Sequence, residues 1–207
     1  MSEITHEAGL RALWFAALGE LCYRRVVVRE LLLDGSAAPG RAGISVDIDL
    51  LDASQLDEYN TFRRTSDPNA VARRMEAGHK CFVARHGGEI VCACWGATEN
   101  AWSGYLSRPI PLASDEAYLY DLYTAPQRRG LGIRGVITRA MHDFYKAEGK
   151  RRLLGFTVPE NVAAMVGSTF RQIGVTGYFG VGRLRFNFCR MDPGELAPGK
   201  ARQAGSL

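Results

Sequence analysis

A loop of glycines and arginines at residues 127–132 (QRRGLG) combines residue types that bind phosphate groups. It precedes a segment with the apolar spacing of a long helix. The first N–H groups of a helix have no intrahelical partners, and the helix dipole adds partial positive charge there. The two glycines lack the Cβ atoms that would keep an anion away, and the two arginines, with Arg134 just beyond them, add charge. The loop therefore predicts a diphosphate site.

The letters of this loop have other interpretations. Gly130, Gly132 and Gly135 also spell the dinucleotide fingerprint G-x-G-x-x-G, which normally opens the first βαβ unit and is followed by an acid at the end of the next strand. Here the loop lies late in the chain, and the predicted strand 153–158 has no acid at its end before Glu160. A turn with purely structural glycines is a further alternative. We favour the diphosphate site without a dinucleotide fold.

The elements around the loop follow from hydrophobic periodicity. Alternating or continuous apolar runs predict strands over 22–33, 44–50, 80–85, 89–96, 116–124, 152–158 and 178–191. Helical spacing predicts helices over 6–20, 56–62, 67–76, 131–148 and 161–173, the last ending at Gly174. Asp52 or Ser54 can cap the second of these helices. A hairpin turn at 87–88 and a helix stop at Gly149 complete the pattern.

This order of elements resembles the GNAT superfamily of N-acetyltransferases. The resemblance rests on Gln127-x-x-Gly130-x-Gly132 after the fourth strand of residues 44–191 and on Asn161 after the fifth. It implies an α/β (α+β) fold, with a mixed, mostly antiparallel central sheet splayed between strands 4 and 5 and flanked by helices. It also implies direct transfer of an acetyl (acyl) group to an amine, with acetyl-CoA or another acyl-CoA as co-substrate and no metal.

The resemblance assigns donor contacts to three places in the chain. The loop binds the pyrophosphate, the strand before it presents backbone groups to the pantetheine arm and thioester, and Asn161 contacts the donor or caps a helix. The implied donor residues are Leu122, Tyr123, Thr124, Gln127, Arg128, Arg129, Gly130, Leu131, Gly132, Ile133, Arg134 and Asn161.

The acid–base residues are less defined. Many relatives carry a Tyr four residues before the Gly that ends the helix after the fifth strand, and counting back from Gly174 gives Phe170, which cannot donate a proton. The substitutes in reach are Ser168, Thr169 and Tyr178. As base we expect Asp121, which lies among apolar residues in its strand, or Glu160, although Asp121 also fits a structural role.

Composition bounds the class of protein. The 207 residues are 46% hydrophobic and 23% charged, which is typical of one globular domain. The net charge of +4 is too small and dispersed to indicate a nucleic-acid partner. No apolar run reaches the roughly 18 residues of a membrane span, and Glu3 and Glu7 are unlike a signal peptide, so we expect a cytoplasmic protein. Of the five cysteines, Cys92 and Cys94 lie in an apolar strand-like run and are expected to be buried thiols without a zinc site.

The sequence divides into an N-terminal helix–strand extension (1–43), an acetyltransferase domain (44–191) and a flexible tail (192–207). We expect the strand 23–33 to add to a sheet edge in the same chain or in a partner, which would make a homodimer. A small-molecule amine acceptor is expected over helices 54–77 and the loop 97–114. An amino sugar, an amino acid, another small amine and a protein N-terminus all stay open. Two other functions remain: a catalytically degenerate sensor or scaffold that binds acyl-CoA, and an acyltransferase with a longer acyl-CoA or an acyl-carrier-protein donor.

Overall fold

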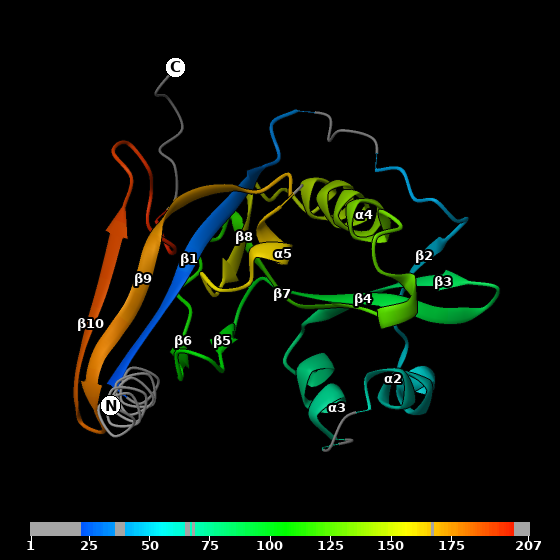
Figure 1. Ribbon diagram of the computed structural model, residues 1–207, viewed down its shortest axis with the longest axis horizontal. Coiled ribbons are helices and arrows are strands. Elements are labelled where there is room, and N and C mark those ends of the chain that lie inside the picture. The colour runs from blue at the N-terminus through cyan, green and yellow to red at the C-terminus, as the bar shows by residue number, and fades with distance from the viewer. Residues whose placement is uncertain (1–21, 36–39, 65–66, 68, 167, 201–207) are drawn as a thin grey trace, which may run out of the picture.

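The computed structural model describes residues 22–35, 40–64, 67, 69–166 and 168–200 (Figure 1). The helix expected over 6–20 lies outside the described residues. Eight strands form one sheet in the order β10-β9-β1-β8-β7-β4-β3-β2. Their bounds are β1 Tyr23–Leu32, β2 Asp47–Leu50, β3 Lys80–His86, β4 Glu89–Ala97, β7 Glu116–Thr124, β8 Arg152–Thr157, β9 Arg171–Val181 and β10 Leu184–Met191. Only β7 and β8 pair in parallel, which confirms the mixed, mostly antiparallel sheet.

Helices cover both faces of the half of the sheet that β7, β4 and β3 form. The helix α4 (Ile133–Ala147) buries Ile137 and Met141 against one face, and α2 (Leu56–Arg63) and α3 (Asn69–Glu76) bury Tyr59 and Val71 against the other. Alternation along β4 supplies both cores, since Cys92 and Cys94 face α4 while Ala93 and Trp95 face α2 and α3. The remaining short elements are η1 Ala53–Gln55, β5 Trp102–Ser103, β6 Arg108–Pro109, η2 Pro126–Arg128 and α5 Val162–Met165.

The strand β1 lies inside the sheet. It pairs with β8 through Val28↔Phe156 and with β9 through Val26↔Thr176, so the expectation that it would add to an edge is wrong. Its three consecutive valines are buried, as in a strand covered on both faces. Both of its sides are paired, and the homodimer expected from a free edge at this strand therefore loses its basis.

A buried ion network joins this strand to the end of the described chain. Arg152, only 2% exposed, donates from Nη1 to Glu30 at 3.0 Å and from Nε to Glu116 at 2.7 Å. The same guanidinium donates to the carbonyl groups of residues 196 and 197. Gly199 N–H donates to Glu116. Residues 192–200 are thus held against the sheet, and the expectation of a frayed tail is wrong for this part.

The helix expected over 161–173 is also wrong. The helix α5 has four residues, and from Arg171 the chain continues as β9. Gly174 is not a helix stop, because it lies within β9. A glycine is required there because a Cβ would lie 2.4 Å from the Arg190 carbonyl oxygen of the neighbouring strand. Gly177 approaches Arg24 in the same way. Phe170 was matched to the position of a catalytic Tyr by counting back from the end of this helix. Because the helix does not extend to Gly174, that match is not valid.

Candidate active site

The sheet opens between β7 and β8. These strands pair only from Glu116↔Arg152 to Leu119↔Gly155, and beyond those residues they diverge. A cavity of ≈ 380 Å³ occupies the opening. Its lining comprises Arg29, Cys94, Leu119, Tyr120, Asp121, Leu122, Arg134, Gly135, Thr138, Gly155, Phe156, Thr157, Val158, Asn161, Ala164, Ser168, Thr169 and Phe170. The splay expected from the sequence is therefore present.

A β-bulge lies on the β7 side of this opening. The register shifts from Ala93↔Tyr123 to Trp95↔Tyr120, so that two residues of β7 stand opposite Cys94. One of them, Asp121, has a φ of 51°, which is unusual for a residue with a side chain. Bulges reorient side chains next to a site, and here the bulge falls within the stretch that lines the cavity.

The predicted phosphate loop leads into α4. Both of its glycines have positive φ, 78° at Gly130 and 73° at Gly132, and Gly132 is the N-cap residue of the helix. A Cβ at Gly130 would meet nothing within 4 Å, so this residue faces open space. A Cβ at Gly132 would lie 2.3 Å from the Arg41 carbonyl oxygen, and Gly43 N–H donates to the Leu131 carbonyl at 2.8 Å. The segment 40–43 thus braces one side of the loop and leaves the Gly130 side open.

The arginines near the loop have different roles. Arg129 donates to the Thr124 carbonyl at 3.2 Å, and its guanidinium lies 6.0 Å from the Tyr123 ring centroid. Arg134 donates to the carbonyl groups of Ala164 and Val166, which ties α4 to the segment around α5. Arg29 of β1 also donates to Ala164, so two guanidiniums hold this segment over the cavity. Burial lowers the pKa of Arg29, and the neighbouring Arg134 lowers it further.

Four of the residues predicted for the site border this cavity, namely Asp121, Leu122, Arg134 and Asn161. The Asn161 side chain also accepts from Ala164 N–H at 3.1 Å, so it caps α5. Tyr123 packs on Phe62, and Thr124 contacts Cys92. The remaining donor residues, Gln127, Arg128, Arg129, Gly130, Leu131, Gly132 and Ile133, form the loop and the start of α4 and are not among the lining residues.

Asp121 is clamped between two cations. Arg63 and Arg74 each donate to one of its carboxylate oxygens at 2.7 Å. The same guanidiniums lie over aromatic rings, Arg63 at 4.1 Å from Tyr123 and Arg74 at 5.2 Å from Trp95. The apolar surroundings expected of a base are therefore absent, because two guanidiniums contact the carboxylate. The sequence around Asp121 could not show this, since Arg63 and Arg74 belong to helices that are distant in sequence.

The other two acid–base candidates lie away from the cavity. Tyr178 of β9 is buried against Val26 and Leu106, with Arg185 over its ring at 4.5 Å. Glu160 is exposed in the turn before α5. Neither is among the lining residues, whereas Ser168 and Thr169 are.

One pair escaped the sequence analysis. The Tyr120 hydroxyl lies 2.6 Å from Nδ1 of His79, and the two rings meet edge to face at 5.7 Å. Burial raises the pKa of Tyr120 and lowers that of His79. His79 follows α3 and carries no motif. The alternation in β7 that places Tyr118 and Tyr120 on one face was the available signal.

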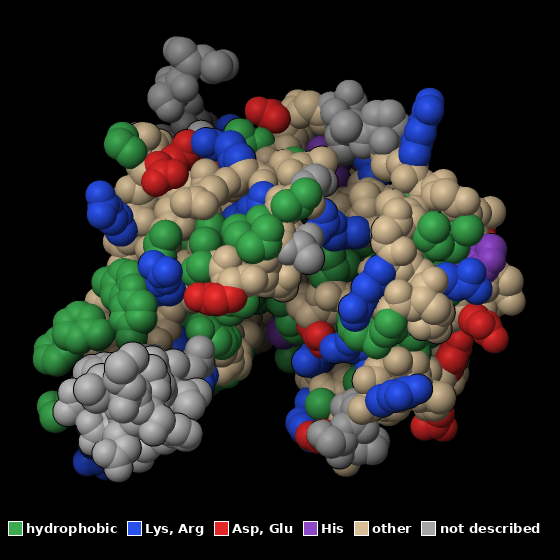
Figure 2. Space-filling model, in the orientation of Figure 1, with side chains coloured by type: hydrophobic (Ala, Val, Ile, Leu, Met, Phe, Trp, Pro, Cys, Tyr) green, Lys and Arg blue, Asp and Glu red, His purple; other side chains and the backbone are tan. Residues whose placement is uncertain are grey.

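In the described part of the chain, the two surfaces expected to bind the acceptor contact different strands of the sheet. Arg108 in the loop 97–114 donates to Thr176 and Asn187, and Tyr105 accepts from Arg24, so this loop contacts β1, β9 and β10. Tyr59, Phe62 and Arg63 lie instead with β4 and β7. Figure 2 shows the molecule hollowed on the side of α3 that faces β5 and β6.

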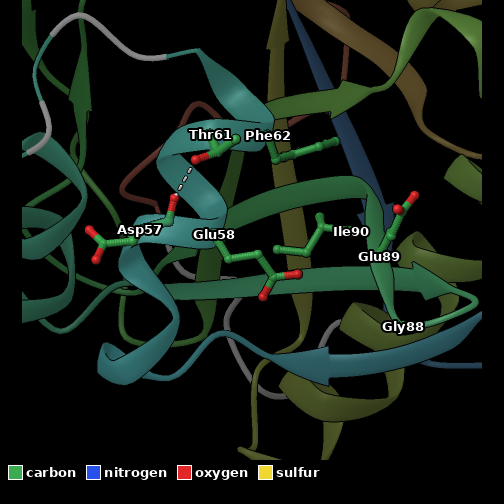
Figure 3. A pocket seen from close by; sticks show the side chains of 7 residues that line it. All are labelled: Asp57, Glu58, Thr61, Phe62, Gly88, Glu89 and Ile90. Atoms are coloured by element: carbon green, nitrogen blue, oxygen red, sulfur yellow. Dashed lines mark hydrogen bonds between the residues drawn. The ribbon is translucent and has the colours of Figure 1, made fainter.

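A second cavity lies between α2 and the β3–β4 turn (Figure 3). It measures ≈ 460 Å³ and shares no lining residue with the cavity at the splay. Its lining comprises Asp57, Glu58, Thr61, Phe62, Gly88, Glu89 and Ile90. Glu58 is engaged by Arg85, so we assign no chemistry to this cavity. Among the helices in the described part of the chain, none has the length and apolarity needed to cross a membrane.

Comparisons with known proteins agree with this geometry. No protein of curated function matches the sequence. The glucosamine N-acetyltransferase region of a fungal multi-domain β-N-acetylglucosaminidase superposes with a TM-score of 0.55 at 15% identity, over 82% of this chain and 22% of that chain. GNAT-family acetyltransferases from Novosphingobium aromaticivorans (18% identity, 73% of this chain and 62% of that chain) and Colwellia psychrerythraea (17%, 72% and 53%) each give 0.50. These likenesses show the fold. The profile of the acetyltransferase (GNAT) family matches residues 48–165, more than half of the chain, and the chain therefore belongs to this family.

Proposed function

We propose that the chain transfers an acyl group, acetyl in the first instance, from an acyl-CoA directly to an amine. The observation that carries this proposal is the cavity between the diverging strands β7 and β8, beside the glycine loop at the start of α4. An acyl-CoA has a diphosphate at one end and a thioester at the other, joined by an amide-containing arm. The loop follows β7 in the chain, and the unpaired edge of β7 borders the cavity.

The residues fit such a donor. The open space at Gly130 and the N-terminal N–H groups of α4 suit the diphosphate, with Arg128 and Arg129 beside them. The backbone of Leu122 to Thr124 is not paired with β8 and can bond the amides of the arm. Arg134 and Asn161 hold the wall formed by α5.

Direct transfer is favoured over a covalent enzyme intermediate. Cys94 is the thiol that lines the cavity, and burial raises its pKa well above the ordinary value. A thiol nucleophile needs its thiolate form, which this environment disfavours. The acceptor amine must instead attack the thioester itself, forming a C–N bond as the C–S bond breaks, after its ammonium form has lost a proton.

Of the two residues predicted as base, Asp121 and Glu160, only Asp121 borders the cavity, and of the substitutes for the acid, Ser168 and Thr169 border it while Tyr178 does not. Its two ion pairs indicate that it positions Arg63 and Arg74. The sensor or scaffold alternative drew its support from Phe170 replacing a catalytic Tyr. That support is lost, because residues 171–181 form a strand.

A pair of variants matched in side-chain shape but not in charge tests donor binding. Asn and Asp both tolerate the positive φ of residue 130 and differ in charge. We expect Gly130→Asp to bind acetyl-CoA about tenfold more weakly than Gly130→Asn, because a carboxylate would face the diphosphate. Calorimetry measures the two affinities for acetyl-CoA, and equal affinities would contradict the proposal that this loop binds the diphosphate.

Turnover is tested by incubating the protein with acetyl-CoA and a panel of amines while free CoA and acylated amine are quantified by chromatography. We expect one acylated amine for each CoA released. Tight binding without any turnover would favour the sensor instead. Release only from longer acyl-CoA, or from acyl-carrier protein, would correct the donor.

A further inference from the structure

We propose that Tyr120 and His79 form the proton relay of this site, in which the Tyr120 hydroxyl receives a proton from the acceptor ammonium and passes its own to His79. This inference rests on the proposed acyl transfer and supplies the base that Asp121 and Glu160 do not provide.

The geometry links His79 to the cavity through Tyr120. Tyr120 lines the cavity and immediately precedes the bulge at Asp121. Its hydroxyl lies 2.6 Å from Nδ1 of His79, a distance suited to proton transfer. The Tyr118 ring stacks against the Tyr120 ring at 5.5 Å and 6°. The phenol therefore bridges the cavity and the imidazole.

The surroundings keep His79 neutral and ready to accept a proton. Burial lowers the pKa of its imidazole, and the nearby Arg74 guanidinium lowers it further. The backbone of Glu99 and Asn100 and the Glu99 carboxylate act in the opposite direction and favour the protonated ring. Nε2 is buried without a hydrogen bond to the described residues. With Nδ1 accepting from the phenol, Nε2 carries the ring proton on that buried side.

The tyrosine by itself is a poor base. Burial raises the pKa of its phenol, so the phenolate is disfavoured and the proton must move onward as a new one arrives. In the relay, an ammonium N–H proton bonds to the Tyr120 oxygen while the Tyr120 O–H proton bonds to Nδ1 of His79. The amine then attacks the thioester carbon, the C–S bond breaks, and the departing sulfur takes the second proton from the nitrogen. The imidazolium finally releases its proton to water.

Kinetics of three variants test the relay. We expect Tyr120→Phe and His79→Gln each to lower kcat about 100-fold, with the double variant no worse than either single variant, because both remove the same step. The acidic limb of the kcat–pH profile, which rises as His79 loses its proton, should disappear in His79→Gln. Tyr118→Phe removes a hydroxyl from the adjacent ring and should leave kcat and its pH profile unchanged.

A second readout does not depend on turnover. The His79 ring resonance can be titrated by NMR in the protein without donor, and its pKa should move in Tyr120→Phe but not in Tyr118→Phe. Acetyl-CoA affinity should be the same in all these variants. If kcat of Tyr120→Phe stayed within about threefold of the wild-type kcat, the relay would be overturned and the acyl transfer would stand. If the wild-type protein turned over no amine, both the relay and the acyl transfer would be overturned. If the His79 pKa were the same in Tyr120→Phe as in wild type, the hydrogen bond between Tyr120 and His79 would be contradicted.

Discussion

The carbonyl oxygen of Arg41 occupies the place next to Gly132 that a side chain would need, 2.3 Å from an ideal Cβ. Residue 132 must therefore be glycine for two reasons, its φ of 73° and the backbone that crosses it. Gly130 shares only the first reason. The predicted phosphate loop thus depends on a segment that precedes it by some ninety positions in the sequence.

This difference predicts unequal effects of the same substitution. Gly130→Ala should cost about 1 kcal/mol of unfolding free energy for its positive φ. Gly132→Ala should cost about 2–4 kcal/mol, since the Arg41 backbone must also move. Urea denaturation measures both, and equal losses would mean that the segment 40–43 does not brace the loop in solution.

Asp121 is predicted to act on stability and on the positions of two arginines. Asp121→Asn leaves Arg63 and Arg74 without their shared carboxylate in a partly exposed place, so we expect a loss of about 1–2 kcal/mol. The shape of the kcat–pH profile should stay the same. A profile that lost its acidic limb in this variant would restore Asp121 as the base.

The buried network predicts a large effect at Arg152. Arg152→Met would leave Glu30 and Glu116 buried without their central cation and should cost about 3–5 kcal/mol. Arg171, whose side chain is half exposed, contacts Glu30 from the rim of the network. Arg171→Met is the matched control, and a loss as large as that of Arg152→Met would contradict the ranking by burial.

Glu58 gives a pH-dependent prediction. Its hydrogen bonds with the Arg85 guanidinium, at 2.6 and 2.8 Å, lower the pKa of the carboxyl in the folded state. A lowered folded pKa stabilises the protein above the unfolded pKa, and the gain is lost as pH falls through the folded value. Because Glu58 is substantially exposed, Glu58→Gln should cost under about 1 kcal/mol at pH 7. The difference in melting temperature from wild type should vanish in acid.

Local signals predicted the elements well and the contacts between them less well. The hairpin of β3 and β4, the strand β7, the loop and α4 all follow from periodicity and glycine placement within short windows. The contacts of Asp121 could not be predicted from such short windows, because its partners lie 58 and 47 residues away. The prediction of a helix after Asn161 was wrong for a related reason. Gly174 matches a helix stop by letter, and only the neighbouring strand shows that close approach requires a glycine there.

The interior position of β1 has a consequence for synthesis. Its partners β8 and β9 begin at Arg152 and Arg171, so during synthesis β1 must wait for segments far later in the sequence before it can pair in the sheet. Until then its run of valines is available to other chains. Closing the sheet also joins segments that are distant in sequence, and contacts of this kind are associated with slower folding. The stretch from β2 to α4, by contrast, can pair and pack during translation. The strands β8, β1, β9 and β10 can then be added to its edge at β7.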